Sequence, residues 1–146
     1  MKNAIVTALL LVTLFYLTGC APEKKDLVGR WYLVEAEING MDFPGVPICP
    51  SKRSYIEFLD SGRGAEVKYN QFCETTFAEE FDYGLDQWEL TTAPVGTGVR
   101  KRTLKILKLD AEKLTLHLHV DETDRGGKVV DIISHYTKDK DFRKEK

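Results

Sequence analysis

The sequence lacks the short motifs that mark most enzyme active sites. It has no Gly-x-Ser-x-Gly nucleophile elbow, no phosphate-binding glycine loop, and no cysteine free to pair with a histidine as a nucleophile. Carboxylates are plentiful, yet no pair is marked out by its spacing. We therefore expect no enzymatic activity and no cofactor.

An excess of positive charge is also missing. Lysine and arginine together number 21 against 23 aspartates and glutamates, and the net charge at pH 7 is −2. No basic face interleaved with aromatic residues can be traced along the chain. Nucleic acid is therefore not an expected partner.

Long apolar runs are absent except at residues 4–17, which follow Lys2. This run is too short to cross about 30 Å of hydrocarbon, and it has the order of a secretory signal. Its end, Leu-Thr-Gly-Cys at residues 17–20, resembles a bacterial lipobox. The resemblance implies cleavage before Cys20, acylation of Cys20, and a membrane-anchored protein of the cell envelope. Ala21 after the cysteine, in place of aspartate, favours the outer membrane.

Cysteine is scarce, with three residues in the chain. Because lipid would consume Cys20, Cys49 and Cys73 remain as an even pair in an oxidising compartment. A disulfide between them would close a loop of about 25 residues and stabilise the fold by roughly 3–4 kcal/mol. Two free thiols are the alternative, and neither cysteine has neighbours at zinc-site spacing.

After a charged tether at residues 20–26, short runs of alternating apolar and polar residues predict an all-β domain over residues 27–138. The run at 113–120 is typical, with leucines at every second position. About eight such runs joined in sequence favour a single antiparallel up-and-down barrel, since closure removes the exposed edges of an open sheet. Residues 139–146 form a charged tail.

One predicted hairpin joins the runs at 55–59 and 65–69. The connection contains Gly62 and Gly64. We expect both glycines to supply the positive φ that a tight turn needs.

The motif Gly29-x-Trp31, at the start of the first predicted strand, resembles that of a lipocalin. More closely, the chain is similar to the lipocalin-like domains of lipoproteins from Bacteroidetes; three further stretches support this, at residues 55–64, 81–90 and 104–116. The resemblance implies a lipocalin-like or calycin-like barrel in which Gly29 and Trp31 close one end. In the family an arginine near the last strand often covers this tryptophan, and here Lys138 or Arg143 would have to do so.

The same resemblance implies a small apolar or amphipathic ligand held inside the barrel. The candidate contacts are the side chains expected to point inward: Glu35, Phe58, Phe81, Tyr83, Trp88, Leu116 and Leu118. Glu35 would be either a buried carboxylate that needs a polar partner or a solvated residue at the open mouth. The alternative function is a filled barrel without ligand that docks another envelope protein through its rim and the loop at 39–50.

Two histidines, His117 and His119, alternate with the leucines and share the other face of their strand. With His135 on the adjacent strand they could form a metal site. We favour the simpler interpretation, a solvated outer face that binds no metal.

Overall fold

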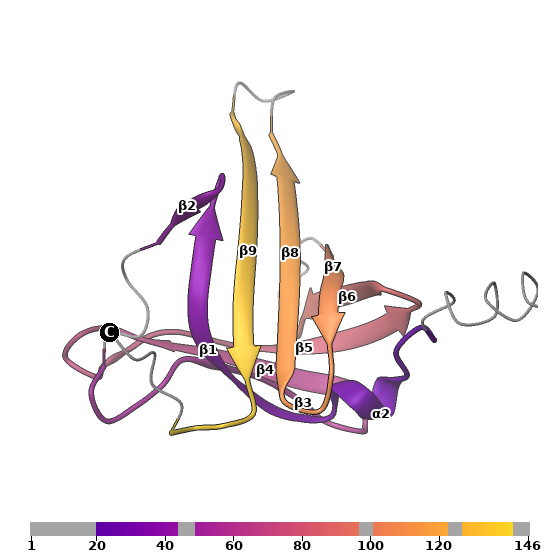
Figure 1. Cartoon of the computed structure of the whole chain (residues 1–146), viewed down its shortest axis with the longest axis horizontal. Coiled ribbons are helices and arrows are strands. Elements are labelled where there is room, and N and C mark those ends of the chain that lie inside the picture. Colours follow the sequence, from indigo (N-terminus) through magenta and orange to yellow (C-terminus); the bar gives the residue numbers. More distant parts are fainter. Residues whose placement is uncertain (1–19, 44–48, 97–100, 123–126, 142–146) are drawn as a thin grey trace, which may run out of the picture.

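The computed structural model describes residues 20–43, 49–96, 101–122 and 127–141, which form an antiparallel barrel with one short helix (Figure 1). In these ranges the elements are α2 (Lys24–Leu27), β1 (Gly29–Ile38), β2 (Met41–Asp42), β3 (Tyr55–Phe58), β4 (Arg63–Tyr69), β5 (Thr75–Asp86), β6 (Glu89–Pro94), β7 (Arg102–Leu109), β8 (Lys113–Asp121) and β9 (Val129–Thr137). The predicted signal peptide, residues 1–19, lies outside the described residues. Among the residues that are described, no helix has the length and apolarity needed to span a bilayer.

The sheet closes on itself through its first and last long strands. Strands pair in the order β2-β1-β3-β4-β5-β6-β7-β8-β9, and β9 also pairs with β1. The first residues of β1 pair with β3, and those from Tyr32 onward pair with β9. Strand β2 adds a short extra ribbon beside β1. The predicted all-β, up-and-down barrel of eight strands is confirmed.

Helix α2 and the start of β1 close one end of the barrel. Leu27 and Trp31 are fully buried there, and Trp31 Nε1 donates a 2.7 Å hydrogen bond to the Leu27 carbonyl oxygen. Gly29 has a φ of +122°, which residues with a side chain rarely adopt, so the bend before Trp31 requires glycine. Lys138 Nζ lies 4.6 Å from the centre of the Trp31 ring, where the family resemblance implies an arginine. The other candidate, Arg143, lies outside the described residues.

Side chains fill the interior next to this closed end. The Phe58 ring is fully buried and meets the rings of Phe81 and Tyr83 edge to face, with centres 5.9 and 5.0 Å apart. Aliphatic side chains from the neighbouring strands complete this core: Leu33, Ile56, Leu90, Ile106, Leu114 and Leu116. The closed half of the barrel is therefore a packed core without room for a large ligand.

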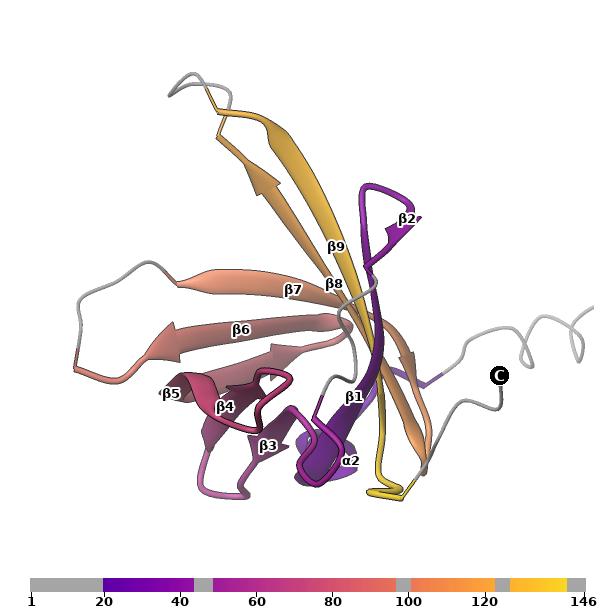
Figure 2. The ribbon, with the colours of Figure 1, turned by 90° about the vertical axis from the view of Figure 1, so that its left-hand side faces the viewer.

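The opposite end of the barrel is open. Figure 2 shows β8 and β9 diverging from β6 and β7 toward this end. Cys49 and Cys73 form the predicted disulfide, with their Cα atoms 4.9 Å apart. The bond ties the segment before β3 to the turn between β4 and β5, so it fixes two of the connections at the open end.

The two glycines of the β3–β4 hairpin have different roles. Gly62 has a φ of +87° and makes the turn, as predicted. Gly64 does not adopt a positive φ; an added Cβ would instead lie 2.5 Å from the Phe81 ring and 2.5 Å from the Glu57 carbonyl oxygen. Glycine is needed at position 64 because the aromatic core packs directly against the backbone.

We expect Gly64→Ala to lower the free energy of unfolding by about 1–3 kcal/mol, the usual penalty for overpacking. The control is Gly84→Ala on β5, where an added Cβ meets no atom within 4 Å and the change should stay within about 0.5 kcal/mol. Urea unfolding followed by circular dichroism measures both variants. Equal effects of the two substitutions would contradict the steric role of Gly64.

Candidate functional site

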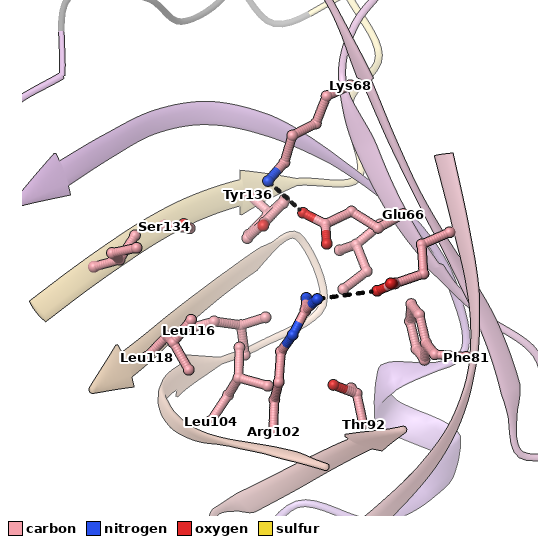
Figure 3. A pocket seen from close by; sticks show the side chains of 13 residues that line it. Glu66, Lys68, Phe81, Thr92, Arg102, Leu104, Leu116, Leu118, Ser134 and Tyr136 are labelled. Atoms are coloured by element: carbon pink, nitrogen blue, oxygen red, sulfur yellow. Dashed lines mark ion pairs between the residues drawn. The ribbon is translucent and has the colours of Figure 1, made fainter. Parts of the chain in front are cut away.

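A cavity of about 120 Å³ occupies the open half of the barrel (Figure 3). Its apolar wall comes from five strands: Ile56, Phe81, Leu104, Leu116, Leu118 and Ile132. These side chains converge because each lies at an inward position of an alternating strand. The remaining lining is polar: Glu66, Lys68, Glu79, Thr92, Arg102, Ser134 and Tyr136.

Two ion pairs line the cavity toward its open side. Glu66 and Glu79 are cross-strand partners on β4 and β5, an arrangement in which like charges repel. Each carboxylate has its own cation: Glu66 Oε1 lies 3.0 Å from Lys68 Nζ, and Glu79 Oε2 lies 3.3 Å from Arg102 Nη2 (Figure 3). The carboxylate side chains are 17% and 23% exposed, whereas the cations are 49% and 38% exposed. The positive groups therefore lie nearer the solvent.

Tyr136 contributes a buried hydroxyl to the same cavity. Burial raises the pKa of Tyr136, and the nearby Glu66 carboxylate raises it further, while a hydrogen bond with Ser134 acts in the opposite direction. The phenol therefore keeps its proton at neutral pH. It can donate a hydrogen bond to a polar group in the cavity.

Five of the predicted ligand contacts lie inside the barrel, and they divide into two groups. Phe81, Leu116 and Leu118 line the cavity. Phe58 and Tyr83 belong to the packed core beside it, and the Tyr83 hydroxyl donates a 2.8 Å hydrogen bond to the carbonyl oxygen of residue 59. The latter two residues therefore support the cavity rather than line it.

The prediction that Glu35 points into the barrel is wrong. Leu33 pairs with Tyr136 and Glu35 pairs with His135, so two steps along β1 match one step along β9. This β-bulge inverts the alternation of β1. Ala36 takes the next buried position, and Glu35 lies on the outer face beside His135.

The predicted strand position of Trp88 is wrong, although its side chain is partly buried and packs against the core cluster. Strand β6 begins one residue later than predicted, so Trp88 lies in the turn between β5 and β6. Its carbonyl oxygen accepts a 2.7 Å hydrogen bond from the Ile106 N–H. Its side chain lines a surface hollow at the closed end, together with Cys20, Leu109 and Lys138.

The histidines lie on the outer face of β8 and β9, on the other side of the sheet from the cavity. His117 Nε2 and His119 Nδ1 each lie 2.8 Å from the same atom, Asp131 Oδ1. His135 Nε2 lies 3.2 Å from Glu37 Oε1. The third member of the predicted metal-ligand set, His135, thus has a different carboxylate partner, and an aspartate takes its place beside the other two histidines.

The contacts with Asp131 change two pKa values. The hydrogen bond and the negative charge of Asp131 raise the pKa of His119. Hydrogen bonds from His119 and then from His117 lower the pKa of Asp131. The pair with charged His119 therefore stabilises the folded chain fully below pH about 6.5, the ordinary histidine pKa. This contribution is lost as the pH rises through the higher pKa of the folded state.

We expect Asp131→Asn to lower the pKa of His119 toward its ordinary value, because the amide removes the charge and keeps the size of the side chain. Titration of the imidazole ring protons by NMR measures this pKa in both proteins. The ring of His135, which contacts Glu37 instead, serves as the internal control. A His119 pKa that does not fall in the variant would contradict the contact geometry.

Comparison with known proteins connects this chain to one fold. No protein-family model matches it, and no curated protein matches it in sequence. Among solved structures, a lipocalin-like protein from Bacteroides uniformis is similar, with 17% identity and a TM-score of 0.53 over 77% of this chain and 98% of that one.

Two further structures give the same result. A bovine lipocalin allergen has 13% identity and a TM-score of 0.50, over 84% of this chain and 79% of that one. An odorant-binding protein has 19% identity and a TM-score of 0.50, over 86% of this chain and 80% of that one. At these identities the likeness shows the fold alone, and it agrees with the closed barrel described above: the chain has a lipocalin-like barrel fold.

Proposed function

We propose that this protein is a membrane-anchored binding lipoprotein of the cell envelope that holds one end of a small amphipathic molecule in its barrel. The observation that carries the proposal is the cavity itself, in which an apolar wall meets two ion pairs at the open side. The names of similar structures, an odorant-binding protein among them, fit a small-ligand role.

The size of the cavity limits what it can enclose. Sites that surround a drug-sized ligand have volumes of about 300–1,000 Å³, whereas an apolar cavity of about 150 Å³ accepts benzene. At about 120 Å³ this cavity encloses only the end of a ligand. The rest of the molecule would extend through the open end of the barrel.

The charges suggest which head group is preferred. Lys68 and Arg102 are more exposed than the carboxylates they pair with, so they are the first charged groups that a molecule meets on entry. Both cations can shift to an incoming anion while still contacting their own carboxylates. We therefore propose that the ligand is a short-chain carboxylate, or a similar amphiphile that carries an anionic group at the end of an apolar chain.

Hexanoate is a suitable probe for this proposal. Burying about five methylene or methyl groups at about 0.8 kcal/mol each predicts an affinity in roughly the millimolar range. Hexylamine, which carries the opposite charge on the same chain length, should bind more weakly. Chemical-shift changes in an amide NMR titration measure both affinities.

Matched variants locate the binding site. Leu118→Trp fills the cavity and should abolish hexanoate binding. Leu107→Trp introduces the same side chain at a position that is 46% exposed, and binding should be unchanged. Equal binding by the two variants, or tighter binding of hexylamine than of hexanoate, would contradict the proposal.

The alternative function is a protein-interaction module. Large apolar side chains are exposed near the connections at the open end, among them Met41, Phe43 and Phe72. Exposed apolar groups of this kind favour a protein partner. Failure of the wild-type chain to bind any of the probes would favour this alternative over ligand binding.

Membrane anchoring rests on the lipobox resemblance at residues 17–20 and on Cys20, which is exposed and not part of the disulfide. Two or more acyl chains would make the attachment stable.

We expect the full-length protein expressed in a Gram-negative bacterium to enter the detergent-rich phase when membranes are extracted with a phase-separating detergent. Cys20→Ala removes the acylated residue and should move the protein to the aqueous phase. The barrel of this variant can be checked by circular dichroism. Wild-type protein in the aqueous phase, or identical partitioning of the variant, would exclude the anchor.

A further inference from the structure

The outer face of β8 and β9 holds a second group of functional side chains, separate from the cavity. Alternation along β8 points Leu116 and Leu118 into the barrel and His117 and His119 away from it. Asp131 is the cross-strand partner of His119 on β9. Three side chains that can bind a metal therefore gather on one solvent-facing surface.

The ligand atoms of these residues lie close together. His117 Nε2 and His119 Nδ1 are both 2.8 Å from Asp131 Oδ1, and all three atoms lie within 4.8 Å of one another. In a tetrahedral zinc site with bonds of about 2.0–2.2 Å, ligand atoms are roughly 3.3 Å apart. Small side-chain rotations are therefore enough to place the three atoms around one ion.

The backbone holds Asp131 in place. Its N–H donates a 2.9 Å hydrogen bond to Asn39 Oδ1, and its carbonyl oxygen accepts a 2.8 Å bond from the Asn39 N–H. Asn39 lies in the turn between β1 and β2. This turn therefore helps β8 and β9 to hold the aspartate in position. A site held by rigid elements in this way loses little conformational entropy when it binds an ion.

We propose that His117, His119 and Asp131 form a surface site for a divalent transition-metal ion, with Zn²⁺ as the reference ion. Two imidazole nitrogens and one carboxylate oxygen are the donors that zinc accepts, whereas Ca²⁺ takes oxygen ligands almost exclusively. The three side chains are 27%, 55% and 42% exposed, which leaves at least one coordination position open to water or to a further ligand.

Isothermal titration of the full-length, tag-free protein in detergent with Zn²⁺ tests the site. We expect one ion to bind per chain and no binding of Ca²⁺. His119→Gln and Asp131→Asn should each weaken zinc binding by at least about tenfold, the loss typical when a metal site is disturbed. Zinc should also shift the NMR signals of the His117 and His119 rings, which gives a readout at the named residues.

His135→Gln is the matched control, because His135 lies on the same outer face but contacts Glu37. It should leave the zinc affinity unchanged. Absence of zinc binding to the wild-type chain, undiminished binding by His119→Gln, or an equal loss in His135→Gln would each overturn the assignment. Hexanoate binding should be the same in all these variants, so the result is independent of the proposed ligand-binding function.

Discussion

The pairing of β1 with β9 is the constraint on which the rest of this structure depends. Strand β1 is long enough to pair with β3 through its first residues and with β9 through the remainder, so one strand joins both sides of the sheet. Closure gives every strand of the barrel an inner and an outer face. The packed core, the cavity and the outer histidine surface all follow from that division.

The two halves of the interior differ because different side chains occupy the inward positions. Near Trp31 these positions hold aromatic and branched residues, which fill the space. Toward the open end, glutamate, lysine and arginine take the same positions, and charged groups keep contact with water instead of closing the space. The same strands therefore form a packed core where their inward residues are apolar, and a cavity where their inward residues are charged.

The sequence was sufficient to predict the class of fold, because alternation in runs such as 113–120 and the Gly29-x-Trp31 motif are local features. The disulfide was also predictable from the number of cysteines. Glu79 could have been found, since it lies two residues before Phe81 in one strand and shares its face. Its partner Arg102 could not, because that contact depends on how distant strands are aligned.

Other differences have the same origin. The bulge that turns Glu35 outward appears only in the register of β1 against β9, and a single extra residue changes every later side chain of the strand. The packing role of Gly64 could not be predicted from the sequence, because it depends on the Phe81 ring, which reaches Gly64 only in the folded barrel. The aspartate beside His117 and His119 was missed for the same reason, since the pairing of β8 with β9 brings it there.

The position of Cys20 beside Trp88 and Lys138 has a consequence for orientation. These residues line a hollow at the closed end of the barrel. A lipid on Cys20, as proposed above, would therefore place the closed end toward the membrane and the open end toward the aqueous space. A ligand would then enter the barrel from solution rather than from the bilayer. A molecule dissolved in the bilayer would have to leave it before it could enter the barrel.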